Sequence, residues 1–142
     1  MDSGWSLHPQ LDRDTASLGD LPLSRVLVNN DANYPWLILV PRRPDLVEVI
    51  DLDEAAQAQL IKEATRAARA LRDVTVCHKL NIAALGNVVP QLHVHVIARF
   101  RHDPAWPNPV WNVVPRRAYR REELDDFVQS LRSKLGARVI SW

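Results

Sequence analysis

His93 and His95 stand two residues apart in a short segment in which polar and apolar side chains alternate. Strict alternation is typical of a β-strand with one buried face. Side chains two positions apart on a strand point to the same side of the sheet. We therefore predict that Gln91, His93 and His95 share one face, which forms a site. The opposite face enters the core, and its members are Leu92, Val94 and Val96.

Two imidazoles on one strand face have three possible uses, of which the first two are a structural role and a metal site. A lone strand histidine is usually structural, hydrogen-bonded within the core. A catalytic zinc needs three protein ligands, so a third would have to come from His78, His102 or a distant carboxylate. Neither histidine has a spacing that argues for this role.

The third use is nucleophilic attack on phosphorus, which requires no metal. A neutral imidazole attacks well when its other ring nitrogen is held by an acceptor that fixes the tautomer. A second imidazole can then hydrogen-bond a phosphate oxygen and stabilise the developing charge. The turn formed by Gly86, Asn87 and Val88 comes just before the histidines. Its backbone N–H groups would add donors that bind anions.

Short apolar runs between turn signals indicate the strands that hold this segment in place. Residues 25–28 and 36–40 are two such runs, and the polar turn at 29–33 predicts a hairpin between them. A third strand is expected over residues 79–84. The histidine strand follows it and is expected to end near Phe100.

Two helices are predicted from their end signals and their 3.6-residue periodicity. The first is expected to start at a capping box of Asp51 and Glu54. The second is expected over residues 121–135, with Gly136 just past its last turn. Strands with a long helix packed on one face predict an α+β fold. The apolar stripe of the first helix consists of Leu52, Ala56, Leu60, Ala64, Ala67 and Leu71.

Length and composition indicate one globular domain. Its 142 residues divide into an N-terminal arm or short helix at 1–20, a core at 23–109, and a C-terminal segment with a helix at 110–142. A formal net charge of +1 gives no reason to expect nucleic acid or a membrane surface as a partner. The lone Cys77 cannot form an internal disulfide, and no apolar leader or spanning segment is found. We therefore expect a cytoplasmic protein.

Residues 90–99 resemble the motif of the histidine-triad (HIT) superfamily, His-x-His-x-His followed by apolar residues. The similarity extends from about residue 23 to residue 109. Residues 28–31 resemble the strand end at which this family holds a ribose, and residues 36–41 resemble the next strand with its closing proline. Further matching positions are Asn81, Gly86, Asn87, Trp106 and Pro107.

The resemblance implies a role for each part of the site. His93 is expected to be the nucleophile that forms a covalent nucleotidyl-histidine intermediate, and His95 is expected to contact the phosphate. Asn29, Asn30 or Asp31 would face the ribose hydroxyls, and the sequence does not decide among them. The α-phosphate is expected to lie against Asn81, Gly86, Asn87 and Val88.

Two positions depart from the family pattern. Gln91 stands where the first histidine of the triad is expected, although the backbone carbonyl that orients the nucleophile is retained. Trp36 stands where related enzymes often carry a further histidine. With fewer titratable groups in the site, activity is expected to be weaker or altered. Arg99 and Arg101 continue the face of His95, and either one is a candidate to reach a phosphate.

The resemblance thus implies an α+β, HIT-like domain with an antiparallel sheet of about five strands, a long helix on one face and a C-terminal helix. The implied function is hydrolysis or transfer at the α-phosphorus of a nucleoside phosphoramidate or a dinucleoside polyphosphate. The resemblance further implies that Gln91, His93 and His95 form the catalytic group, that the protein is a homodimer, and that it uses no cofactor. The alternatives are a nucleotide-binding module with little turnover and a metal-dependent hydrolase.

Overall fold

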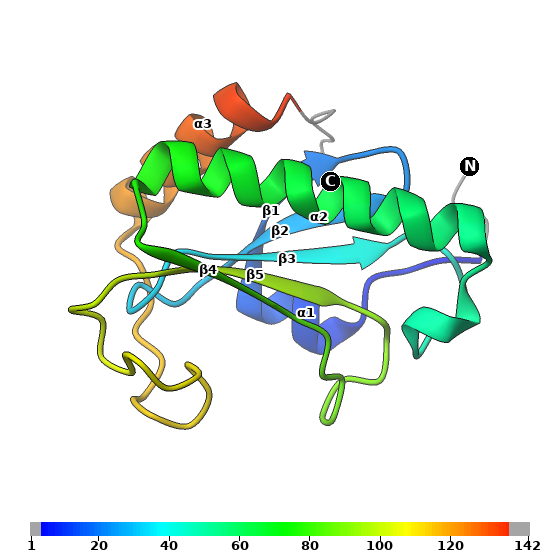
Figure 1. Ribbon diagram of the computed structural model, residues 1–142, viewed down its shortest axis with the longest axis horizontal. Helices are drawn as coiled ribbons and strands as arrows, with labels where there is room; N and C mark the ends of the chain where they lie inside the picture. The colour runs from blue at the N-terminus through cyan, green and yellow to red at the C-terminus, as the bar shows by residue number, and fades with distance from the viewer. Residues whose placement is uncertain (1–3, 137–142) are drawn as a thin grey trace.

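A computed structural model describes residues 4–136 of the chain. Its centre is a five-stranded antiparallel sheet with the strand order β1-β2-β3-β5-β4 (Figure 1). Together with its helices, this sheet forms the α+β fold that the sequence predicts. The strands are β1 (Thr15–Asp20), β2 (Ser24–Asn29), β3 (Trp36–Pro41), β4 (Lys79–Ala83) and β5 (Val94–Arg99).

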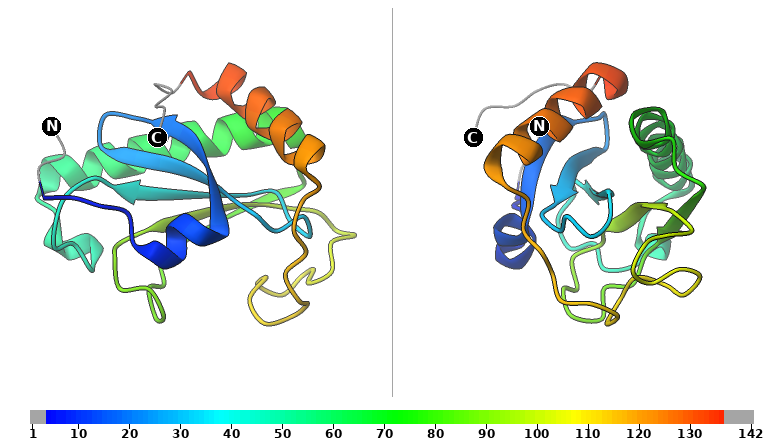
Figure 2. Two further views of the ribbon diagram at one scale, coloured as in Figure 1. Left: turned by 180° about the vertical axis from the view of Figure 1, so that it is seen from behind. Right: turned by 90° about the vertical axis from the view of Figure 1, so that its left-hand side faces the viewer.

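Helices cover both sides of this sheet. The long helix α2 (Glu54–Thr75) packs across β3 and β5, and α3 (Arg121–Leu135) lies beside it against β1. The short helix α1 (Pro9–Asp14) lies on the opposite side, together with the loops that flank β5 (Figure 2). A 3₁₀ turn, η1 (Val49–Asp51), precedes α2.

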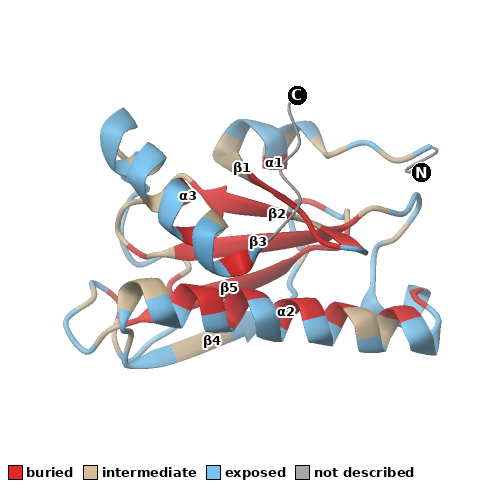
Figure 3. Cartoon of the chain, turned by 90° about the horizontal axis from the view of Figure 1, so that it is seen from above, coloured by how far each residue is buried: buried red, intermediate tan, exposed pale blue. Residues whose placement is uncertain are grey.

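The sheet buries a separate apolar cluster on each face. Both central strands, β3 and β5, are buried at every position because each of their faces is covered (Figure 3). Leu92, Val94 and Val96 belong to the cluster under α2, as their alternation predicts. The second cluster lies on the other face around Trp36. His95 contacts Trp36 there, so the histidines lie on the side of the sheet away from α2.

The predicted helical patterns are confirmed. Every member of the predicted stripe is buried, although Leu52 lies just before α2 and not in it. Helix α3 spans the residues expected from its end signals, and Gly136 follows it with φ +65°. Glycine adopts this left-handed conformation without the strain that a Cβ would add.

Two local predictions are wrong. Residues 15–20 are the edge strand β1 and not part of an arm, because they pair with β2 through a bulge between Ser17 and Gly19. Helix α2 does not start with a capping box of Asp51 and Glu54. Asp53 caps it by accepting from the backbone N–H of Ala56, and Asp51 instead closes the preceding 3₁₀ turn.

None of the α-helices within residues 4–136 has both the length and the apolar character needed to cross a membrane.

Candidate active site

The backbone of Gln91 fixes the state of the His93 ring. His93 Nδ1 lies 2.7 Å from the carbonyl oxygen of Gln91. A carbonyl only accepts hydrogen bonds, so Nδ1 must carry the proton. The lone pair of the neutral ring is then on Nε2, which is the nitrogen available for attack. Only 7% of His93 is exposed, so little water surrounds the ring.

His95 is held in the opposite tautomer. The indole Nε1–H of Trp36 donates to His95 Nδ1 over 2.9 Å. An indole N–H can only donate, so Nδ1 is unprotonated and the proton of the neutral ring is on Nε2. The ring centroids of His93 and His95 are 4.9 Å apart. The two histidines therefore form a pair in which one Nε2 can attack and the other can donate.

Aromatic rings surround His95 on two further sides. Its centroid lies 5.5 Å from Trp36 and 5.2 Å from Trp111, and the two indoles contact each other edge to face at 5.6 Å. Burial, with a smaller contribution from His93, lowers the pKa of His95 to about 4. His95 is therefore a neutral hydrogen-bond donor near pH 7.

The side chain of Gln91 is hydrogen-bonded to the N-terminal segment. Its Nε2 donates to the carbonyl oxygen of Ser6, and its Oε1 accepts from the backbone N–H of His8, each over 2.9 Å. His8 in turn caps α1 by accepting from the backbone N–H of Gln10. Gln91 thus joins α1 to the histidine segment, while its backbone orients the His93 ring.

Asn29, at the end of β2, and the two residues after it contact residues 110–119, which we call the C-terminal strap. Asn29 Oδ1 accepts from Arg116, and Asn30 Oδ1 accepts from the backbone N–H of Tyr119, each over 2.9 Å. Asp31 Oδ1 accepts from the backbone N–H of Arg117. Among residues 4–136, no hydrogen bond links these three residues to the histidines. Their side chains hold in place the strap that brings Trp111 to His95.

Arg99 is not free to bind a phosphate, contrary to one sequence-based expectation. Only 1% of the residue is exposed, and its guanidinium donates to Asp103 at 2.8 and 3.1 Å and to the carbonyl oxygen of Asn108. It also donates to Asn81 Oδ1, which positions an amide expected near the phosphate. Arg101 lies at the exposed surface and donates to His78.

Sequence reasoning missed Asp103. Its carboxylate also accepts from the backbone N–H groups of Phe100, Ala105 and Trp106. Burial opposes ionisation, but the hydrogen bonds from Arg99 and from the backbone outweigh it and lower the pKa of Asp103. In the sequence, Asp103 before Pro104 is typical of an ordinary turn. Nothing in that pattern indicates that its carboxylate pairs with the buried Arg99, 4 residues earlier.

The remaining predicted residues lie in the β4–β5 connection and in β4. Gly86 turns the chain with φ +71°, and Asn87 and Val88 are exposed. Within the described part of the chain, no hydrogen bond joins this turn to the histidines. Asn81 lies opposite Ile97 in the β4–β5 ladder, and Ala83 lies opposite His95. Two-residue alternation places Asn81 and Ala83 on the same face of the sheet.

No group of three His, Cys, Asp or Glu side chains in residues 4–136 is arranged to hold a metal ion.

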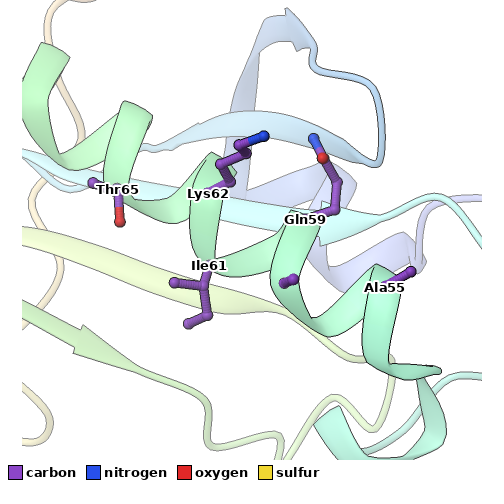
Figure 4. Close-up of a pocket in the computed structure, with 6 residues that line it drawn as sticks. Ala55, Gln59, Ile61, Lys62 and Thr65 are labelled. Carbon is purple, nitrogen blue, oxygen red and sulfur yellow. The ribbon is translucent and has the colours of Figure 1, made fainter.

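A surface hollow of about 490 Å³ lies elsewhere, along the outer side of α2 (Figure 4). Its lining consists of Ala55, Ala58, Gln59, Ile61, Lys62 and Thr65. The histidines are on the opposite face of the sheet, so this hollow is separate from the candidate active site.

Comparison with known proteins identifies close structural relatives. A model of the HIT domain matches residues 10–102. A histidine triad protein from Bradyrhizobium japonicum is 62% identical, with a TM-score of 0.90 over 92% of this chain and 98% of that one. A histidine triad protein from Sinorhizobium meliloti is 41% identical, with a TM-score of 0.92 over 95% and 100%. One from Marinobacter aquaeolei is 39% identical, with a TM-score of 0.90 over 93% and 96%. Comparison with curated protein sequences gave no match.

Proposed function

Because this chain belongs to the HIT domain family, we propose that it is an enzyme that cleaves nucleotides at the α-phosphorus through a covalent intermediate on His93. The observation that carries the proposal is the pairing of complementary tautomers. The hydrogen bond to Gln91 leaves His93 Nε2 unprotonated, and the hydrogen bond from Trp36 leaves a proton on His95 Nε2. A nucleophile and a donor therefore lie side by side.

In the first step, the lone pair of His93 Nε2 forms a bond to the α-phosphorus. The bond from phosphorus to the leaving group breaks, and its electron pair departs with the leaving group. The positive charge that develops on the His93 ring is stabilised because Nδ1–H already donates to the carbonyl oxygen of Gln91. His95 Nε2–H donates to a phosphoryl oxygen and stabilises the charge that accumulates there.

In the second step, a water oxygen attacks phosphorus. The phosphorus–Nε2 bond breaks, and its electron pair returns to His93 as the neutral ring. The proton lost by water passes to solvent, and the product is a nucleoside monophosphate. No metal, redox partner or further cofactor takes part in this scheme.

We propose that the rest of the site binds the nucleotide in the family's manner. Gly86, Asn87 and Val88 contribute backbone N–H groups to the α-phosphate, and Asn81 contributes its amide. The proposal is supported for Asn81 by its place on the same face as Ala83, the residue opposite His95. Gln91 takes the first triad position and contributes through its backbone. The ribose contacts are assigned to the strand end, at Asn29, Asn30 and Asp31.

The proposed function is tested by trapping the intermediate. Wild-type protein and the variant His93→Ala are mixed with α-³²P-labelled nucleotides, with chelator present, and quenched in alkali, in which phosphohistidine survives. His102→Ala is the matched control, since its ring is exposed and contacts only Phe100 among the rings of the described residues. We expect label on wild type and on His102→Ala, and none on His93→Ala. Label on His93→Ala would refute the assignment of the nucleophile.

A nucleotide-binding module with little turnover is the second candidate. One observation favours it: the side chain of Gln91, at the first triad position, is hydrogen-bonded to Ser6 and His8, and Trp36 donates to His95 where related enzymes carry a further histidine. The trapping experiment separates the two candidates. Binding of a nucleotide by calorimetry without any labelled adduct would favour the module.

We also propose that the protein is a homodimer, joined at the free edge of β4 and the neighbouring face of α2. Ile82 on β4 is 52% exposed, and Ile61 beside the hollow on α2 is 66% exposed (Figure 4). An unpaired edge strand with exposed apolar side chains readily pairs with another strand. Ile82→Lys should yield monomers by light scattering, whereas Ile50→Lys, at an exposed site before α2, should not.

An unpaired Cys77 agrees with the reducing cytoplasm that we propose as the compartment.

A further inference from the structure

Trp36 prevents His95 from acting as a proton donor in its charged form. To become an imidazolium, His95 would need a proton on Nδ1. That proton would point at the indole N–H of Trp36, whose nitrogen lies 2.9 Å away. Two donors would then face each other with no acceptor between them, in a buried site where water cannot take over. The hydrogen bond from Trp36 therefore adds to burial in disfavouring the charged form of His95.

A neutral imidazole can donate a hydrogen bond, but it cannot readily give up its remaining proton. His95 Nε2–H can thus stabilise charge on an oxygen, yet it cannot deliver a proton to a departing atom. General acid catalysis would require the imidazolium form, which the surroundings disfavour. Trp111 covers another side of the ring and contributes no titratable group.

The other ionisable groups near His95 do not replace this missing acid. His93 is the nucleophile in the proposed function, and its Nδ1–H donates to the carbonyl oxygen of Gln91. Along β5, Arg99 is permanently charged and bound to Asp103, and the pKa of Asp103 is lowered by that pairing. Arg99 and Asp103 are hydrogen-bonded to each other, and Asp103 also accepts from the backbone N–H of Phe100.

Leaving groups differ in how much they need an acid. When a phosphoanhydride bond breaks, the leaving phosphate oxygen takes the electron pair and is stable as an anion without protonation. When a phosphorus–nitrogen bond breaks, the nitrogen takes the pair as an amide anion unless it receives a proton at the same time. An acid therefore accelerates cleavage of phosphoramidates far more than cleavage of anhydrides.

We infer that Trp36 makes this site selective for phosphoanhydrides, such as dinucleoside polyphosphates, over nucleoside phosphoramidates. The inference rests on the proposed function, in which His93 attacks the α-phosphorus. Trp36 is a positioning residue in this scheme, because it acts on the leaving group through His95.

The experiment measures the rate of adduct formation on His93 at saturating diadenosine triphosphate and at saturating adenosine 5′-phosphoramidate. The ratio of the two rates is compared among wild type, Trp36→Phe and Trp111→Phe. Phe keeps an aromatic ring at each position, but only Trp36→Phe removes an N–H that donates to His95. Forming the ratio within each variant cancels differences in protein stability, and comparing the ratio among variants cancels the difference in substrate size.

Wild type should favour the anhydride by about 10²- to 10⁴-fold, the usual contribution of general acid catalysis. Trp36→Phe should lower this ratio at least about tenfold by raising the rate with the phosphoramidate, because a proton on His95 Nδ1 no longer faces an opposing donor. Trp111→Phe should keep the wild-type ratio. In parallel, ¹⁵N NMR of wild type should show His95 protonated on Nε2 alone, with its Nδ1 signal altered in Trp36→Phe and unaltered in Trp111→Phe.

Equal adduct rates with both substrates in wild type would overturn the inference and leave the proposed function standing. So would an unchanged ratio in a folded Trp36→Phe variant, or NMR evidence for an imidazolium at His95 near neutral pH. Absence of an adduct with every substrate would instead refute the proposed function, and the selectivity argument with it. The two failures are therefore distinguishable.

Discussion

Replacing Asp103 by alanine should destabilise the protein more than any other single change at its surface loops. Asp103 is the carboxylate that neutralises Arg99, whose exposed fraction is only 1%. The same side chain accepts from three backbone N–H groups, those of Phe100, Ala105 and Trp106. Alanine removes all of these acceptors and leaves the guanidinium buried with a full charge.

The expected loss follows from these contacts. Removing one partner of a buried ion pair costs about 3–5 kcal/mol, because the other charge stays buried without compensation. The backbone N–H of Trp106 keeps a longer hydrogen bond to the carbonyl oxygen of residue 103, and loss of the bonds from Phe100 and Ala105 adds about 1 kcal/mol together. We therefore expect Asp103→Ala to lower the free energy of unfolding by about 4–6 kcal/mol. Asp103→Asn keeps one acceptor oxygen but not the charge, and its effect should be about half as large.

Urea unfolding followed by tryptophan fluorescence measures both variants. Asp126→Ala is the matched control, since it removes an exposed carboxylate from α3 and should change stability by less than about 0.5 kcal/mol. A loss below about 1 kcal/mol for Asp103→Ala would refute the reasoning, because such a value is typical of an ion pair in solvent.

Three other predictions concern stability. Gln91→Ala should lower the free energy of unfolding by about 1–3 kcal/mol, since it removes two hydrogen bonds to the N-terminal segment, while NMR should still show a proton on His93 Nδ1. Because burial lowers the pKa of His95 to about 4, the unfolded chain binds a proton there at a higher pH than the folded one. The contribution of His95 to the free energy of unfolding should therefore be complete above about pH 6.5 and fall by about 3 kcal/mol toward pH 4. Urea unfolding at a series of pH values measures this decrease, which the variant His95→Gln should not show. Val76→Gly should raise the melting temperature and stabilise the chain by about 1 kcal/mol, since Val76 ends α2 with φ 53°, a conformation that a β-branched residue adopts only with strain; an unchanged or lower melting temperature would contradict this.

The features that the sequence predicts well are those encoded by short-range patterns. Two-residue alternation assigns Leu92 and Val94 to the core, and helical spacing assigns the stripe of α2. The end signals of α3 are also local, since acidic residues lie at its start and Gly136 follows it. Such patterns are reliable because they depend on the backbone period of one element and not on its neighbours.

The features that sequence reasoning missed depend on partners far away along the chain. Residues 15–20 contain a glycine and no clear alternation, and they form a strand because β2 offers a ladder to pair with. The buried pair of Arg99 and Asp103 is visible only once the loop folds back over β5. The sequence indicates Trp36 only as a replacement for a histidine. Its hydrogen bond to His95 joins residues 59 positions apart, so no local pattern predicts it.

The C-terminal strap has a consequence for the time at which the site is completed during synthesis. The contacts that hold the strap connect residues 86 to 89 positions apart, as in the bond from Tyr119 to Asn30. Chains grow at about 5–20 residues per second from the N-terminus, so both histidines leave the ribosome seconds before the strap can dock. A nascent chain that ends before Trp111 carries the nucleophile, but one side of its partner ring is open to water. The strap closes that side only after residues 110–119 have emerged, so the nucleophile is in place before the finished site is assembled.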